Sequence, residues 1–355
     1  MMLRVELQEE TALTRNSSPT RPTIAMAMGD PAGISPELAA KLLTLDEVRS
    51  AARIVIFGDR RILAEGERIA GVDSGVVTVE SEDALPDTDA PIFVDLHHLA
   101  PEDVRRGEAT LAGGTFATQN FRRALLFAKA GHAGAVFFTP FNKAAMRQAY
   151  PAYDDEIRFV NDVLGLNEPA SEFNVLGELW NARVTSHVPL SQVAAAITGE
   201  KIERALRLAD RAMRDAGFER PRIAVAGLNP HAGDGGNFGR EEIDVIEPAV
   251  AKAKADGLTV EGPFPSDTVF LRAKAGTFDA VLTMYHDQGQ IAMKLMGFDR
   301  GVTLLGGLPF PICTPAHGTA YDIAGRGIAN IGATREAFAL AVRMASARKQ
   351  ASAAA

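Results

Sequence analysis

Residues 280–289 read AVLTMYHDQG, a run of uncharged, mostly apolar residues that passes directly into a motif with histidine, aspartate and glycine. Such a run predicts a buried strand that ends in a functional loop. Comparable runs lie at 23–28, 53–57, 91–94, 135–138 and 222–226, and stretches with helical spacing of apolar residues lie at 116–130, 202–216 and 241–255. Buried strands that alternate with helices predict an α/β protein with a mostly parallel sheet covered on both faces. Pro248 is expected to kink or interrupt the last helix.

Three of the seven histidines stand in short motifs punctuated by glycine or proline. His231 in NPHAG and His286 in YHDQG directly follow predicted strands, and His187 lies in TSHVPL. A single histidine is more often a hydrogen-bonded core residue than a ligand. Three neutral imidazoles, however, can hold a divalent cation and leave positions for substrate. The pattern therefore predicts a catalytic metal centre of His187, His231 and His286, with zinc, magnesium, manganese, cobalt and iron all candidates.

Other polar residues follow predicted strands, where loops at the carboxyl ends of parallel strands build sites. The motif GDPAGISPE at 29–37 follows the first strand, and Lys143 follows the strand at 135–138. Asp287 and Lys294 are the candidate catalytic residues. We rank Asp287 first as general base and Lys294 first as a substrate contact, although a solvated surface aspartate is nearly as common.

Composition limits the possible functions. The chain has 355 residues, enough for two domains, and a net charge of -8, which argues against nucleic acid as a partner. No apolar run reaches the roughly eighteen residues of a membrane span. The single cysteine, Cys313, excludes an intrachain disulfide. The first 22 residues are polar and are expected to form a disordered leader rather than a secretory signal, so we expect a cytoplasmic protein.

The stretch AHGTAYDIAGRGIAN at 316–330 is the most specific in the chain. It resembles the cofactor loop of the isocitrate and isopropylmalate dehydrogenase superfamily. The resemblance implies that the loop wraps the adenosine half of a nicotinamide dinucleotide through His317, Gly318, Thr319 and Ala320. Asp322 would then accept hydrogen bonds from the ribose hydroxyls. A carboxylate at that place repels a 2′-phosphate, which favours NAD over NADP.

Together with residues 29–37, Lys143, His187, residues 229–242 and His286–Gly289, this loop resembles the 4-hydroxythreonine-4-phosphate dehydrogenase family over roughly residues 23–345. The resemblance implies a two-domain isocitrate/isopropylmalate dehydrogenase-like fold with an active-site cleft between the domains. It also implies an NAD-dependent oxidoreductase acting on CH–OH, a homodimer and a metal on the three histidines. We expect a leader at 1–22, a first domain of 23–135 with 300–349, and a second domain of 136–299.

The chain departs from the family at positions that resemble substrate contacts. Asp154 and Asp155 stand where the family has His-Thr, Thr303 stands where it has Asn, and Ile312 stands where it has Arg. Lys294 is a candidate substrate contact, and either Arg158 or Arg300 could hold a substrate carboxylate. Lost donors and added negative charge would repel a phosphate dianion.

These departures predict a hydroxy-acid substrate without phosphate, for example a cis-dihydrodiol carboxylate, whose oxidation is followed by decarboxylation. On this interpretation 4-hydroxythreonine 4-phosphate is a poor substrate. The alternative is 4-hydroxythreonine-4-phosphate dehydrogenase activity in pyridoxal phosphate biosynthesis. An alternative of another class is a phosphate acyltransferase of similar architecture, which would need neither NAD nor the three histidines.

Overall fold

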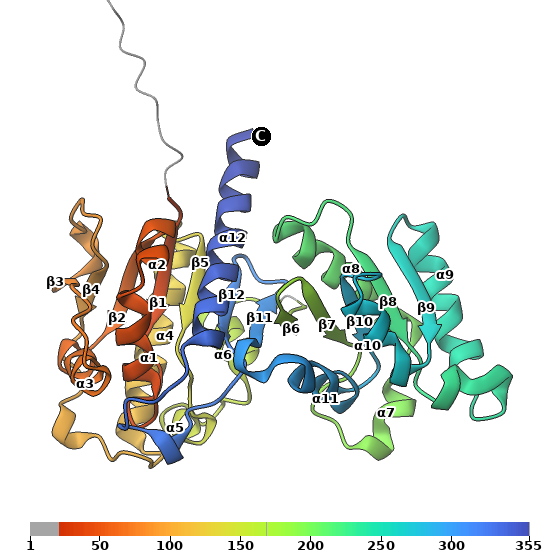
Figure 1. The fold of residues 1–355 in the computed structure, drawn as a ribbon, viewed down its shortest axis with the longest axis horizontal. Coiled ribbons are helices and arrows are strands. Elements are labelled where there is room, and N and C mark those ends of the chain that lie inside the picture. The colour runs from red at the N-terminus through yellow and green to blue at the C-terminus, as the bar shows by residue number, and fades with distance from the viewer. Residues whose placement is uncertain (1–20, 168, 355) are drawn as a thin grey trace, which may run out of the picture.

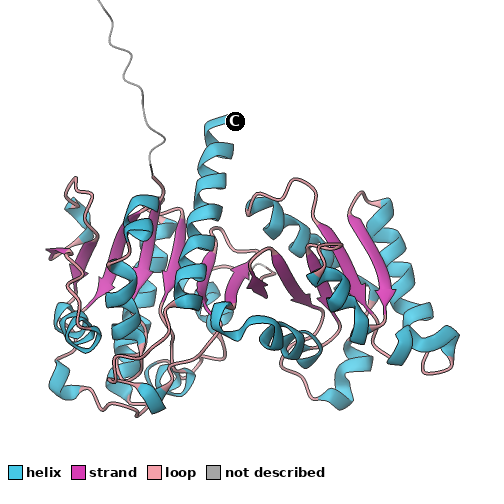
Figure 2. Ribbon diagram, in the orientation of Figure 1, coloured by secondary structure: helices cyan, strands magenta, loops and turns pink. Residues whose placement is uncertain are grey.

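The computed structural model describes residues 21–167 and 169–354, which form a twelve-stranded sheet covered by helices (Figures 1 and 2). The leader expected at 1–22 falls almost wholly outside the described residues. The strands are β1 Thr23–Ala27, β2 Arg53–Gly58, β3 Val77–Val79, β4 Ile92–Asp95, β5 Ala135–Phe138, β6 Ser171–Leu176, β7 Leu179–Arg183, β8 Arg222–Ala226, β9 Thr259–Phe264, β10 Ala280–Thr283, β11 Val302–Gly306 and β12 Ile312–Pro315. The α/β prediction is confirmed.

The sheet has the order β3-β4-β2-β1-β5-β12-β11-β6-β7-β10-β8-β9. β11 and β6 pair antiparallel with both of their neighbours, and all the other strand pairs of the sheet are parallel. These two strands join the half that contains β1 to the half that contains β10. The division into domains at residues 135 and 300 stays a prediction.

Alternation along β1 shows why both faces of the sheet are covered. Ile24 and Met26 pack into one core with α1 and α12, while Ala25 and Ala27 pack into another core with α4. The helices are α1 Ser35–Leu43, α2 Asp46–Ala51, α3 Arg60–Ala70, α4 Leu111–Lys129, α5 Lys143–Ala149, α6 Glu156–Leu164, α7 Leu190–Ala196, α8 Gly199–Asp215, α9 Glu247–Ala255, α10 Ser266–Lys274, α11 His286–Gly297 and α12 Gly332–Ala354. In Figure 1, α12 (blue) stands against the middle of the sheet, where it contacts β5 and β12.

Pro248 has the predicted effect on the helix expected at 241–255. The segment divides into a π-helical turn, Glu242–Ile246, and α9, where the proline occupies the first turn and needs no backbone donor. None of the described helices is long and apolar enough to cross a membrane.

Three antiparallel pairings separate the two halves, so their strands run in opposite directions along the sheet. The carboxyl ends of the parallel strands nevertheless lie on one side of the molecule, the lower side in Figure 1, where α5, α7 and α11 begin. The motifs singled out in the sequence follow β1, β5, β7, β8, β10 and β12 on this side.

Candidate functional site

Two neighbouring cavities lie on the side of the molecule where the parallel strands end. We call the first the histidine cavity, because His187, His286 and His317 all line it, together with Lys143, Lys294 and Thr303. Its volume is about 270 Å³. The second, the α8 cavity, has a volume of about 370 Å³ and is lined by side chains of α8, β6 and the segment after β7. His187 and Glu172 line both cavities and therefore stand between them.

The ends of β7 and β10 bring His187 and His286 together. Thr185 donates from its backbone N–H (3.1 Å) and its hydroxyl (2.8 Å) to the carbonyl of Met284. Each histidine follows this junction by two residues, and the two ring centroids are 5.8 Å apart. A ring bound to zinc has its centroid about 3.2 Å from the ion, so two rings at this separation can share one cation.

Asp287 fixes the orientation of the His286 ring. Its Oδ1 lies 2.6 Å from Nδ1 of His286, which leaves Nε2 for another partner. A carboxylate in this arrangement orients a metal-ligating imidazole and raises its basicity. The Asp287 side chain is 71% exposed and lines neither cavity, whereas Lys294 lines the histidine cavity.

His231 lies apart from the other two histidines. It begins a run of five residues, 231–235, with left-handed backbone conformation, of which His231, Ala232 and Asp234 are not glycine. His231 lines neither cavity. Within residues 21–167 and 169–354, no group of three or more His, Cys, Asp or Glu side chains forms a metal-binding cluster. The predicted set of three ligands is therefore not assembled within the described chain.

A buried carboxylate holds the His231 loop in this conformation. Glu242 is 1% exposed, and its Oε1 accepts the backbone N–H groups of Leu228 and Asn229 at 2.7 Å each. Its Oε2 accepts from Nδ2 of Asn229 at 2.9 Å. A Cβ at Gly233 would lie 2.7 Å from Oε2, so the loop closes tightly over Glu242.

Sequence reasoning missed a buried polar network beneath the two cavities. The guanidinium of Arg183 pairs with Glu172, and it donates at 3.0 Å each to Oδ1 of Asn174 and Oγ of Ser186. Gln290, on α11, donates to the same Asn174 oxygen at 2.9 Å. The sequence signal that could have revealed this network is the polar composition of residues 171–183, SEFNVLGELWNAR. The same composition explains why β6 and β7 were not predicted, since they are not apolar runs.

The predicted cofactor loop packs against the loop after β1. The backbone N–H of Ile34 donates to the Thr319 carbonyl at 3.0 Å, and a Cβ at Gly33 would lie 2.6 Å from that oxygen. Burial lowers the pKa of His317, so its ring is neutral near pH 7. Nδ1 lies 3.0 Å from the Gly318 carbonyl and donates to it, which makes Nε2 an acceptor, and this buried atom has no protein partner. Asp322 is exposed beside this loop.

Only some of the candidate substrate residues line one of the two cavities. Lys294 and Thr303 line the histidine cavity, and Asp155 lines the α8 cavity. Asp154 and Arg300 are exposed and line neither. Asp155 also caps α6 by accepting the backbone N–H of Arg158 at 2.8 Å.

Histidines and a glycine-rich loop gather at the carboxyl ends of the parallel strands, where α/β enzymes place their active sites. The family model described as pyridoxal phosphate biosynthetic protein PdxA matches residues 50–341. The chain belongs to the PdxA family. As a member it is a dehydrogenase that acts on a CH–OH group, with a nicotinamide cofactor and a divalent metal as the general requirements of the family.

Individual relatives agree with this assignment. A protein of Rhizobium meliloti (strain 1021) named as a 4-hydroxythreonine-4-phosphate dehydrogenase is 66% identical over 337 residues, or 94% of this chain and 97% of the relative. The crystal structure of the 4-hydroxythreonine-4-phosphate dehydrogenase from Klebsiella pneumoniae is 34% identical, with a TM-score of 0.78 over 91% of this chain and 99% of that chain. A terephthalate 1,2-cis-dihydrodiol dehydrogenase from Burkholderia xenovorans LB400 is 31% identical, with a TM-score of 0.62 over 91% and 98%.

The expectation of a substrate without phosphate is wrong. The relative at 66% identity is named for a phosphorylated substrate, and a solved enzyme of that name is structurally closer than the dihydrodiol enzyme. Of the two aspartates on which the electrostatic argument rested, Asp154 is exposed and lines neither cavity, and Asp155 caps α6. Ile312, which replaces a family arginine, is fully buried on β12. The family assignment likewise decides against the phosphate acyltransferase alternative.

Proposed function

We propose that this protein oxidises the secondary alcohol of 4-hydroxythreonine 4-phosphate with NAD in the presence of a divalent metal. The observation that supports this substrate most strongly is the 66% identity to the Rhizobium meliloti protein across 94% of the chain. The two adjoining cavities fit a substrate with a reacting carbon and a phosphate tail. The preference for NAD rests on the exposed carboxylate of Asp322 in the cofactor loop.

His187 and His286 are the proposed metal ligands within the histidine cavity, because their ring centroids lie 5.8 Å apart, a separation that one cation can bridge. A metal bound there would polarise the alcohol oxygen and lower its pKa. Asp287 holds the His286 ring through Nδ1. Lys294, which lines the cavity, contacts the substrate and is placed to move the alcohol proton. This division of roles gives Asp287 an orienting part rather than that of the base.

His231 is the proposed third ligand. It reaches neither cavity within the described chain, so it completes the ligand set either through a rearrangement of its loop or from a second copy in a homodimer. Metal titration of a mixture of His187→Ala and His231→Ala chains separates these routes. If a second copy supplies His231, mixed dimers regain a fraction of the sites that neither variant has alone. If the loop rearranges within one chain, the mixture binds no more than its components.

The activity is tested with purified, metal-loaded protein, NAD, and either 4-hydroxythreonine 4-phosphate or 4-hydroxythreonine. NADH formation is followed by absorbance. We expect kcat/KM to be at least about a hundredfold higher for the phosphorylated compound, since two charge-assisted contacts each contribute on the order of tenfold or more. Equal efficiency with the two compounds, or no NADH from either, would contradict the proposal.

A further inference from the structure

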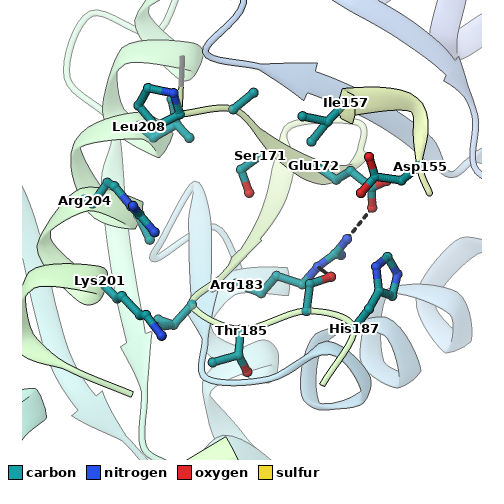
Figure 3. A pocket seen from close by; sticks show the side chains of 15 residues that line it. Asp155, Ile157, Ser171, Glu172, Arg183, Thr185, His187, Lys201, Arg204 and Leu208 are labelled. Atoms are coloured by element: carbon teal, nitrogen blue, oxygen red, sulfur yellow. Dashed lines mark hydrogen bonds and ion pairs between the residues drawn. The ribbon is translucent and has the colours of Figure 1, made fainter. Parts of the chain in front are cut away.

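The α8 cavity has a wall of unbalanced positive charge. Lys201 and Arg204 are three residues apart on the first turns of α8, which puts their side chains on the same helix face. Figure 3 shows both side chains directed toward the middle of the cavity, opposite Asp155 and Glu172. The cations and the carboxylates thus occupy different sides of one space.

Neither cation is neutralised by a carboxylate. Arg204 is exposed and has no side-chain hydrogen bond or ion pair with any residue in 21–167 or 169–354. Lys201 donates only to a backbone carbonyl, that of Ala196, at 2.7 Å. The neighbouring Arg207, on the same helix, pairs with Asp256 and lines neither cavity. Lys201 and Arg204 are the cations that α8 presents to this cavity, whereas Arg211, which also has no ion pair among the described residues, lines neither cavity.

Both carboxylates of the opposite wall have partners within the protein. Glu172 pairs with the buried Arg183, whose side chain is 3% exposed, and Asp155 is engaged in capping α6. Ser171 and Ser186 add hydroxyl groups to the lining. Two free cations beside hydroxyl donors are the groups that bind a phosphate dianion by charge-assisted hydrogen bonds.

We infer that Lys201 and Arg204 form the subsite for the phosphate of the substrate, an inference that rests on the proposed function. His187 connects this cavity to the histidine cavity, so a substrate can hold its alcohol near His187 and His286 while its phosphate extends toward α8. The cofactor loop lies on the other side, since His317 and Gly318 line the histidine cavity only. The phosphate recognised at α8 is therefore that of the substrate and not the pyrophosphate of the dinucleotide.

This subsite also accounts for the departures from the family pattern. Thr303 and Ile312 supply no positive charge at the positions where donors were expected. Lys201 and Arg204 replace that charge from a different element. Specificity for the phosphorylated compound then resides in α8 rather than in β11 and β12.

The test compares Lys201→Gln, Arg204→Gln and the double variant with Arg207→Gln as a matched control. Inorganic phosphate binding is measured by calorimetry without substrate, and kcat/KM is measured for 4-hydroxythreonine 4-phosphate and 4-hydroxythreonine. We expect the double variant to lose at least about tenfold in phosphate affinity and about ten- to hundredfold in kcat/KM for the phosphorylated compound. The efficiency with 4-hydroxythreonine and the behaviour of Arg207→Gln should stay unchanged.

Further measurements keep the outcomes separable. Thermal unfolding confirms that the variants are folded, and Lys201→Arg should restore phosphate binding. Phosphate should compete with the substrate and not with NAD. Wild-type phosphate affinity in the double variant, with its loss instead in Lys143→Gln or Lys294→Gln, would overturn the subsite while the proposed function stands. If the wild type binds phosphate at α8 but oxidises neither compound, the proposed function fails and the anion site remains.

Discussion

The phenol of Tyr321 donates a hydrogen bond to Oδ2 of Asp30, although the two residues are 291 positions apart in the sequence. Asp30 is 1% exposed and lies in the loop after β1, while Tyr321 lies within the predicted cofactor loop. Oδ1 of Asp30 accepts the backbone N–H of Ala32 at 2.9 Å. One carboxylate therefore fixes both the shape of the first loop and its contact with the second.

Replacing Tyr321 by phenylalanine removes the donor and leaves Asp30 buried with one unmatched oxygen. We expect Tyr321→Phe to lower the free energy of unfolding by about 1–3 kcal/mol and to raise the KM for NAD. Chemical denaturation and steady-state kinetics measure the two effects. Unchanged stability together with an unchanged KM for NAD would show that the bond holds nothing in place.

Asp30 also makes a pH dependence testable, because burial raises the pKa of its carboxyl group. When the folded pKa lies above the unfolded one, the group contributes most to stability below the unfolded pKa, and this contribution is lost as pH rises through the folded pKa. The free energy of unfolding of the wild type, relative to that of Asp30→Asn, should therefore fall as the pH rises above the ordinary pKa of an aspartate, about 4. Urea titrations at several pH values measure the difference, and a constant or rising difference would contradict the assignment.

The contact between Asp287 and His286 predicts a change in metal affinity. Asp287→Ala removes the partner of Nδ1, and loss of such a contact typically weakens metal binding by about ten- to hundredfold. Calorimetric titration with zinc gives the affinity directly. Asp267→Ala, which changes an exposed carboxylate on α10, serves as the control. If the two variants bind zinc equally well, Asp287 does not orient the ligand.

The carboxylate of Asp322 should set the choice between NAD and NADP. Asp322→Ser removes the repulsion of a 2′-phosphate, so we expect the ratio of kcat/KM for NAD to that for NADP to fall by at least about tenfold. Kinetics with both cofactors measure the ratio, and Asp267→Ser controls for a general loss of negative charge. A wild-type enzyme that uses both cofactors equally would already refute this role.

Gly289 places α11 against β7, and this contact tolerates no side chain. An added Cβ would lie 2.1 Å from Oδ1 of the buried Asn181. Gly289→Ala should therefore destabilise the protein by about 1–3 kcal/mol through overpacking. Gly199→Ala, at the start of α8, is the matched control, because its Cβ would meet nothing closer than 3.9 Å and alanine favours a helix. Equal unfolding free energies for the two variants would contradict this account.

The sequence predicted the parts of the fold whose side chains are apolar and missed the parts where polar groups are paired inside. Runs such as residues 222–226 and 280–283 are strands as expected, because burial on both faces leaves only apolar residues. β6 and β7 were missed because their buried polar residues have partners that no periodic pattern reveals: Arg183 donates to Asn174, and Asn181 donates to Thr283 and to the Val281 carbonyl.

The candidate site follows the same division. The placement of His286 after a buried strand could be predicted, but its meeting with His187 could not be derived from strand order, because β7, which precedes His187 and pairs with β10, was not predicted. Lys201 and Arg204 could not be predicted, because charged residues on the first turns of a helix usually face solvent, and only the placement of α8 beside β6 turns them toward a cavity. Asp154 and Asp155 misled the interpretation of the substrate, since the sequence does not show that Asp155 caps α6 and that Asp154 is exposed outside both cavities.

The left-handed run at 231–235 places the backbone of the His231 loop under conformational strain. Each non-glycine residue in that conformation costs about 1–2 kcal/mol, and three of the five are not glycine. The hydrogen bonds that converge on Glu242 hold the loop in this strained conformation. If the loop left this conformation, the strain energy would be released and would offset part of the free-energy cost of moving His231 toward the histidine cavity.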